Sequence, residues 1–333
     1  MARLGLKELS LKKIVYLTPS APVLREQMLR WVPAGFELVF ALQSDPDHHL
    51  ELLQDADYIF IAGSRLSRYL IEHAPRLKMI QKWGIGVDKI DVAAAQDRGI
   101  AVYITSGAND VQVAEHTLLL MLATLRKLTY AQKAMQAQQW VNAELRTTCM
   151  QLSGKTVGLY GFGNIAKQVA KQLKGFDVQI LYYSRSQARP EIEQQYGVRY
   201  VDAQSLFAQS DVLSLHAPYT SETFEMINDS TLSLMKPSAV LINTARGELI
   251  RDADLVHALQ TQRLFGAGID VFVQEPPPVD HPFFALDNVV MTPHSGASVQ
   301  EVVDRVIEHG FNNIRLFDLG LPLNPADRVK ARQ

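Results

Sequence analysis

The sequence predicts an α/β protein built from two open parallel-sheet domains, and three features lead to this prediction. Short apolar runs alternate with helix-like segments along almost the whole chain. Such alternation is typical of β-α-β units and therefore of parallel sheets. A long, largely apolar helical stretch at 111–140 separates two series of these units. The length of 333 residues suits roughly two domains, each long enough to bury a core.

The first series occupies about the first hundred residues. Its expected strands are the apolar runs at 13–18, 36–42, 57–63, 77–84 and 100–105. The expected helices between them lie at 22–32, 47–56 and 67–74. We expect the stretch 111–140 to form one spine helix between the domains, and it could also contact another subunit.

The second series begins at "LSGKTVGLYGFG". Its expected strands lie at 155–161, 178–184, 198–202, 211–218, 239–246, 265–272 and 289–294. A last helix, at 298–320, follows the final strand and could return to the first domain.

Composition and charge exclude several classes of protein. Hydrophobic residues make up 47% of the chain and charged residues 20%, as in ordinary globular proteins. The net charge of -2 and the lack of a long basic run argue against nucleic-acid or membrane-surface binding. Cys149 is the only cysteine, which excludes an intrachain disulfide and a cysteine-based zinc cluster and favours the cytoplasm. The segment "MARLGLKELSLKK" is too polar for a secretory signal, and the apolar run at 116–125 is too short to span a membrane.

The stretch "VGLYGFGNIA" has the pattern of a phosphate-binding loop. A strand leads into Gly161 and Gly163, and a helix starts at 164. The glycines permit a sharp turn and close backbone approach, while the helix N-terminus offers free N–H groups to a pyrophosphate. Ala166 replaces the third glycine of the usual pattern. A glycine turn without a ligand is the alternative interpretation.

The following strand ends where a carboxylate would bind the ribose of NAD, and no carboxylate is present there. Ser184, Arg185 and Ser186 occupy this place, with Arg189 just beyond. A cation and two hydroxyl groups suit a 2′-phosphate, so we favour NADP(H), with NAD(H) as the alternative. The alternative interpretation is that these residues belong to a solvated loop and bind no phosphate.

Later strand ends carry charged residues that would line one crevice with the glycine loop. Arg246 lies in "LINTARGEL", Asp270 and Glu275 in "GIDVFVQEPPP", and His294 in "VVMTPHSGAS".

In the first domain, "QKWGIGVDKID" contains a second pair of glycines after a strand. The amides of Ile85, Gly86 and Val87 could form an anion-binding nest, and Trp83 could close a pocket. A simple strand-ending turn is the alternative.

In the combination and order of these motifs, the chain resembles the D-isomer-specific 2-hydroxyacid dehydrogenases over nearly its whole length. The resemblance implies a Rossmann-type cofactor domain, 106–299, inserted into a flavodoxin-like substrate domain formed by 1–105 and 300–333. It implies catalytic roles for Arg246, Glu275 and His294 and a nicotinamide-carboxamide contact for Asp270. It also implies that the loop at 83–87 binds the substrate carboxylate opposite Arg246.

The chemistry of a 2-keto acid reduction accounts for these residue types. The cofactor supplies a hydride to C2. Protonated His294 can supply the proton, and Glu275 beside it would orient the ring and favour its charged form. The guanidinium fork of Arg246 can bind the carboxylate and polarise the keto group. The residues that we expect to contact the cofactor are Gly161, Gly163, Asn164, Ile165, Ser184, Arg185, Ser186, His216, Pro218, Thr244 and Asp270.

Departures from relatives within the family narrow the activity. Phosphite-oxidising relatives carry a lysine where this chain has Ile85, and formate-oxidising relatives carry a glutamine where it has Glu275. These departures favour a glyoxylate/hydroxypyruvate reductase. The resemblance also implies a homodimer, and we expect a cytoplasmic enzyme without a metal. The alternatives are a 3-phosphoglycerate or other D-2-hydroxyacid dehydrogenase that uses NAD, and a dinucleotide-sensing scaffold similar to the family's co-repressors.

Overall fold

The computed structural model describes residues 11–330, which divide into two compact units. The first unit contains the described residues up to Asn109 and those from Val299 onward, and the second runs from Asp110 to Ser298. We placed the corresponding changes at 105/106 and 299/300. Most of the N-terminal segment in which we expect no secretory signal lies outside the described residues.

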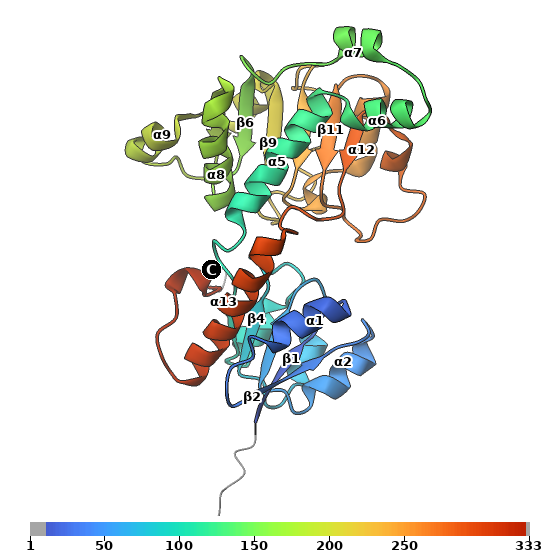
Figure 1. The fold of residues 1–333 in the computed structure, drawn as a ribbon. Helices are drawn as coiled ribbons and strands as arrows, with labels where there is room; N and C mark the ends of the chain where they lie inside the picture. Colours follow the sequence, from blue (N-terminus) through green and yellow to red (C-terminus); the bar gives the residue numbers. More distant parts are fainter. Residues whose placement is uncertain (1–10, 331–333) are drawn as a thin grey trace, which may run out of the picture. The chain divides into compact units, whose positions relative to one another are not determined.

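The first unit is a five-stranded parallel sheet in the order β2-β1-β3-β4-β5, which is the order of flavodoxin-like folds. Its strands are β1 (Lys12–Tyr16), β2 (Phe36–Phe40), β3 (Tyr58–Ile61), β4 (Met79–Lys82) and β5 (Ala101–Tyr103). Its helices are α1 (Pro22–Leu29), α2 (Pro46–Leu53), α3 (Arg68–Glu72), α4 (Val92–Asp97) and α13 (Gln300–Asp318). The final helix α13 packs against β4 and α1 and therefore belongs to this unit (Figure 1).

The second unit is a seven-stranded parallel sheet in the order β12-β11-β10-β9-β6-β7-β8. The strands are β6 (Thr156–Tyr160), β7 (Gln179–Tyr183), β8 (Val198–Tyr200), β9 (Val212–Leu215), β10 (Val240–Asn243), β11 (Gly266–Ile269) and β12 (Val289–Met291). The helices are α5 (Asp110–Leu125), α6 (Leu128–Gln136), α7 (Asn142–Thr148), α8 (Asn164–Leu173), α9 (Pro190–Tyr196), α10 (Ala203–Gln209), α11 (Asp229–Leu232) and α12 (Asp252–Gln260). The strand order reverses between β6 and β9, and a Rossmann-type sheet binds its ligand at that point.

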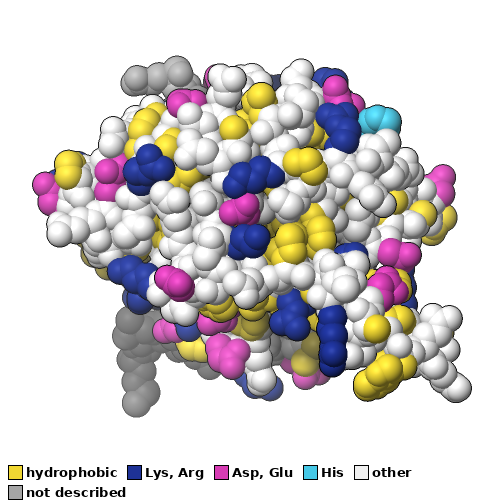
Figure 2. Space-filling model, turned by 90° about the horizontal axis from the view of Figure 1, so that it is seen from above, with side chains coloured by type: hydrophobic (Ala, Val, Ile, Leu, Met, Phe, Trp, Pro, Cys, Tyr) yellow, Lys and Arg dark blue, Asp and Glu magenta, His cyan; other side chains and the backbone are white. Residues whose placement is uncertain are grey.

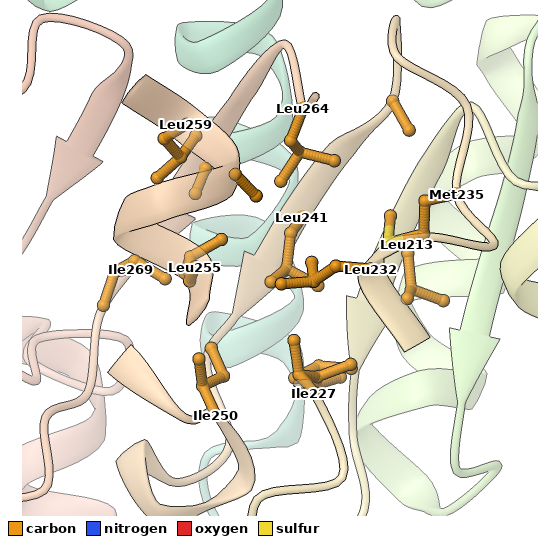
Figure 3. Packing of buried hydrophobic residues seen from close by; sticks show 14 of the residues in the cluster. Leu213, Ile227, Leu232, Met235, Leu241, Ile250, Leu255, Leu259, Leu264 and Ile269 are labelled. Atoms are coloured by element: carbon orange, nitrogen blue, oxygen red, sulfur yellow. The ribbon is translucent and has the colours of Figure 1, made fainter. Parts of the chain in front are cut away.

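Both faces of this second sheet are covered. Along β10, Val240 and Ile242 join the apolar layer under α5 and α8, whereas Leu241 joins the layer on the opposite face. Figure 3 shows the opposite layer, in which Leu241 of β10 lies near Leu255 of α12 and Leu232 of α11. Burial on both faces explains why these strands are continuous apolar runs rather than alternating ones.

The predicted spine helix at 111–140 is wrong as a single element. α5 ends at Leu125, and Lys127 takes a left-handed backbone conformation with a φ of 49° before α6 begins. A second left-handed residue, Gln138, lies between α6 and α7. The Lys127 ammonium group lies 5.5 Å from the centre of the Phe265 ring, a cation–π contact that favours this turn. Neither glycine nor proline marks the break, so helical periodicity alone could not locate it.

The described surface carries charges of both signs. Figure 2 shows lysine and arginine side chains interspersed with acidic ones over the face in view. Within residues 11–330, no helix combines the length and apolar character that are needed to cross a bilayer.

Candidate active site

The glycine loop starts where β6 ends. Gly161 has a φ of +97° and donates its amide to the carbonyl oxygen of Tyr183 at 2.8 Å. A Cβ atom on Gly161 would lie 2.7 Å from the backbone carbonyl carbon and oxygen of His216. The left-handed backbone and this close approach both require glycine. The packing of this turn against the backbone of His216 therefore requires a glycine, with or without a bound ligand.

Gly163 occupies a different environment. It is the N-cap residue of α8, and a Cβ atom there would meet no protein atom within 4 Å. No side chain caps α8, so the first-turn amides, including those of Asn164 and Ile165, lack partners within the helix. Open space beside the positive end of a helix fits the pyrophosphate of a dinucleotide.

A buried carboxyl group lies beside this loop. Asp110, in the first turn of α5, is 8% exposed. Burial raises its pKa, and a hydrogen bond from Asn164 partly offsets this effect. Burial thus favours the neutral form of a group that would otherwise repel a phosphate.

The segment after β7 leaves the sheet next to the glycine loop, because Tyr160 of β6 pairs with Tyr183 of β7. Ser184 is half-buried there, while Arg185 and Ser186 are exposed. The pKa of Glu222, in the segment after β9, is lowered chiefly by a hydrogen bond from Thr220 and also by the positive charge of Arg185. The carboxylate of Glu222 therefore lies within electrostatic range of Arg185, the residue that we expect to bind the 2′-phosphate.

His216 and Pro218 follow β9, the strand beside β6. The His216 amide donates to the carbonyl oxygen of Tyr160 at 2.7 Å, and its ring Nε2 lies 2.9 Å from Ser214 Oγ. Burial lowers the pKa of His216 to about 4, so the ring is neutral near pH 7. The Pro218 carbonyl oxygen accepts a hydrogen bond from the Thr223 hydroxyl group at 2.8 Å.

Arg246 follows β10 and is half-buried. The side chain of Asn243 shapes this turn, donating Nδ2 to the Arg246 carbonyl oxygen at 2.8 Å and accepting the Ala245 amide at 3.0 Å. Arg246 Nη1 donates to the Ala245 carbonyl oxygen at 2.6 Å. Thr244, in the same turn, has its hydroxyl group 3.0 Å from that of Thr117 on α5.

The turn after β10 packs directly on the chain that follows β11. A Cβ atom on Gly247 would lie 2.2 Å from the carbonyl carbon of Phe272, so only glycine permits this contact. Gly247 thus brings the residue after Arg246 against the segment that begins at Asp270 and ends at Glu275.

Glu275 and His294 are in direct contact. His294 Nδ1 lies 2.8 Å from Glu275 Oε1, and the Phe272 amide donates to the same oxygen at 3.3 Å. The His294 side chain is 49% exposed and that of Glu275 is 24% exposed. With Nδ1 directed at the carboxylate, the other ring nitrogen, Nε2, remains for exchange of a proton with a bound molecule.

Asp270 is almost fully buried, and its carboxylate is occupied by the chain around His294. Oδ1 accepts the Ser295 amide at 2.8 Å and the Thr292 hydroxyl group at 2.6 Å, and Oδ2 accepts the Gly296 amide at 3.0 Å. Burial alone would raise the pKa of Asp270, but hydrogen bonds from His116, Thr292 and Ser295 outweigh it, and the pKa is lowered.

The sequence analysis did not select His116 or Thr292. His116 opens the apolar run of α5, which predicts a buried helix face, and Thr292 is the threonine of "MTPH". Two features of the sequence could have indicated these residues. One is a histidine at the start of an apolar helical run, and the other is a hydroxyl residue two positions before a candidate catalytic residue.

The candidate substrate residues lie in the first unit. There the loop after β4 contains Gly84, which has a φ of +87° and donates its amide to the Thr105 hydroxyl group at 2.8 Å. Trp83 packs in an apolar cluster of that unit. Within the described residues, the amides of Ile85, Gly86 and Val87 donate no hydrogen bond. These amides are therefore available to an anion.

Comparisons with known proteins agree on one family. Residues 118–296 match the family described as "D-isomer specific 2-hydroxyacid dehydrogenase, NAD binding domain". A glyoxylate reductase of Thermococcus litoralis is 37% identical, over 81% of this chain and 83% of its own. A D-3-phosphoglycerate dehydrogenase of Methanocaldococcus jannaschii is 36% identical, over 84% of this chain and 53% of its own. The crystal structure of an NAD-dependent formate dehydrogenase from Staphylococcus aureus in complex with NAD superposes with a TM-score of 0.85 at 29% identity, covering 96% of this chain and 100% of that chain.

Proposed function

The chain belongs to the D-isomer-specific 2-hydroxyacid dehydrogenase family, and on that basis we propose that it reduces a small 2-keto acid to the D-2-hydroxy acid. The favoured substrates are glyoxylate and hydroxypyruvate. The observation that carries the proposal is the 2.8 Å pair of His294 with Glu275, in the same unit as the glycine loop. The pair can donate or accept a proton during a reaction, and it belongs to a unit whose fold binds nicotinamide dinucleotides.

Each protein group has a defined task in the proposed reaction. The bound nicotinamide supplies the hydride to C2 of the keto acid. His294 donates the proton from Nε2 to the keto oxygen, while Glu275 holds Nδ1–H and stabilises the imidazolium form. In the reverse direction His294 accepts the proton. Arg246 binds the substrate carboxylate through its planar fork and polarises the keto group.

The loop at 83–87 remains the predicted partner of the substrate carboxylate. The amides of Ile85, Gly86 and Val87 donate no hydrogen bond within the described residues, and successive amides of this kind can bind an anion. Trp83 lies at the start of the loop and is proposed to limit the size of the substrate.

A panel of 2-keto acids, assayed with NADPH and with NADH, tests the proposed activity. We expect turnover of glyoxylate or hydroxypyruvate, with D-stereochemistry where the product is chiral. Faster turnover of 3-phosphohydroxypyruvate would favour the second candidate, 3-phosphoglycerate dehydrogenase, which the 36% identical relative supports. Binding of the dinucleotide without turnover of any keto acid would contradict an enzyme and favour a sensing scaffold.

We propose NADP(H) rather than NAD(H) as the cofactor because Arg185 and its neighbouring serines follow β7 where a carboxylate would select NAD. Replacement of Arg185 by alanine should raise KM for NADPH about tenfold or more, a loss of ~1.4 kcal/mol, and leave KM for NADH nearly unchanged. Glu222→Gln is the matched variant, because it removes the acidic group near Arg185. It should lower KM for NADPH, and equal effects of Arg185→Ala on both cofactors would contradict the 2′-phosphate role.

We further propose a cytoplasmic homodimer. The single cysteine suits a reducing compartment. The exposed large apolar side chains on α5, on α6 and in the segment before α7 include Leu119, Leu128, Met135 and Trp140. Trp140 is 80% exposed, and large apolar side chains left exposed on neighbouring segments support an interface with another subunit. Figure 1 shows α6 and α7 at the edge of the second unit.

A further inference from the structure

His116 is a polar residue within the apolar helix α5, and its ring lies against the strand ends that carry the catalytic candidates. Its side chain is only 12% exposed. Nε2 lies 2.8 Å from Thr292 Oγ1 and 3.3 Å from Asp270 Oδ1. The ring therefore joins α5 to the ends of β11 and β12.

The direction of these hydrogen bonds follows from the groups involved. Thr292 donates its hydroxyl proton to Asp270 Oδ1 at 2.6 Å, because an ionised carboxylate can only accept. The Thr292 oxygen must then accept a hydrogen bond from His116, so the His116 ring carries its hydrogen on Nε2. A chain of hydrogen bonds thus runs from His116 on α5 through the Thr292 hydroxyl group to Asp270.

Asp270 in turn fixes the backbone on both sides of His294. Its carboxylate accepts the amides of Ser295 and Gly296, and its carbonyl oxygen accepts the His294 amide at 2.7 Å. His294 is held with a φ of 50°, an unfavourable left-handed conformation that persists only where the surroundings impose it.

The ring also supports this loop by direct packing. A Cβ atom on Gly296 would lie 3.7 Å from His116 Cδ2 and 3.1 Å from Asp270 Oδ2. The histidine edge therefore forms part of the surface on which the loop rests. Hydrogen bonding and packing reach the same segment, Thr292 to Gly296.

We propose that His116 is a positioning residue that, through Thr292 and Asp270, holds the Thr292–Gly296 loop in the conformation that presents His294 to the substrate. The expected effect of His116 on turnover rests on the proposed function. The effect on the loop itself does not depend on any activity.

The test compares His116→Leu with His116→Gln. Leucine removes the Nε2–H donor at similar bulk, while the glutamine amide places an N–H donor near the former Nε2 position. We expect His116→Leu to lower kcat about 10²-fold, the scale of a misplaced catalytic group. We expect His116→Gln to restore most of this loss. The NMR resonances of the His294 ring in the cofactor-free protein should move in His116→Leu and return toward wild type in His116→Gln.

Thr124→Val is the matched control on the same helix. Thr124 is buried, and its hydroxyl oxygen has no partner among the described residues, so its loss should leave kcat and the His294 resonances unchanged. A His116→Leu protein that loses kcat while its His294 resonances match those of Thr124→Val would overturn the proposal.

If His116→Leu does not fold, His116→Asn replaces it. The asparagine amide is too short to reach Thr292, so this variant should behave as a loss of the donor. Equal kcat values for the asparagine and glutamine variants would count against positioning through Nε2. If the wild-type protein reduces no 2-keto acid, the proposed function fails, and the His294 resonances still decide whether His116 positions the loop.

Discussion

At the scale of single residues, the contact between His294 and Glu275 leads to the most direct prediction. Replacement of His294 by alanine should lower kcat at least ~10²-fold, because it removes the imidazole that, paired with Glu275, is proposed to supply the proton. Cofactor affinity, measured by fluorescence titration, should change little. His257→Ala is the control, since His257 is an exposed histidine in the last turn of α12. Turnover by His294→Ala at the rate of this control would remove the proposed acid.

At the scale of elements, the two glycines at the start of α8 should respond differently to the same change. Gly161→Ala forces a side chain into the backbone of His216 and into an unfavourable φ, so it should lower the free energy of unfolding by more than about 1 kcal/mol. Gly163→Ala meets no protein atom, so it should leave stability within about 0.5 kcal/mol of wild type.

For the affinity of the dinucleotide we expect the opposite order, with the larger effect from Gly163→Ala. The methyl group of Gly163→Ala would occupy the space proposed for the pyrophosphate, and Kd for the dinucleotide should rise about tenfold or more. Chemical denaturation and calorimetric titration of both variants measure the two quantities. Unchanged dinucleotide affinity in a stable Gly163→Ala protein would show that the open space does not receive the phosphate.

At the scale of the whole molecule, the exposed apolar side chains near α6 and α7 predict the state of assembly. Trp140→Glu would introduce a charge into the proposed subunit interface and should shift the protein from dimer to monomer at micromolar concentration. Sedimentation equilibrium measures this change. Val23→Glu is the control, because Val23 is 71% exposed on α1 of the first unit. A wild-type protein that sediments as a monomer would exclude the dimer.

The sequence by itself determined the α/β class and the order of the strands along the chain. The reason is local: apolar runs bounded by turns, and strands separated by helical patterns, leave few topologies other than parallel sheets. The glycine loop and the polar residues at strand ends were also visible, because parallel strands place their carboxyl ends at one edge. That edge predicted that the segments carrying Glu275 and His294 would line one crevice, and the family resemblance implied the pairing of the two side chains.

Only the tertiary structure decided which residues lie behind that pair. The helix break at Lys127 accompanies a contact with Phe265, which is distant in sequence, and the place of His116 depends on how α5 packs on the sheet. His116 and Thr292 are 176 positions apart in the chain, and no periodicity relates them. Hydrogen bonds between distant segments arise from the packing of a helix on a sheet, whereas a strand or a glycine turn is encoded by its neighbours in sequence.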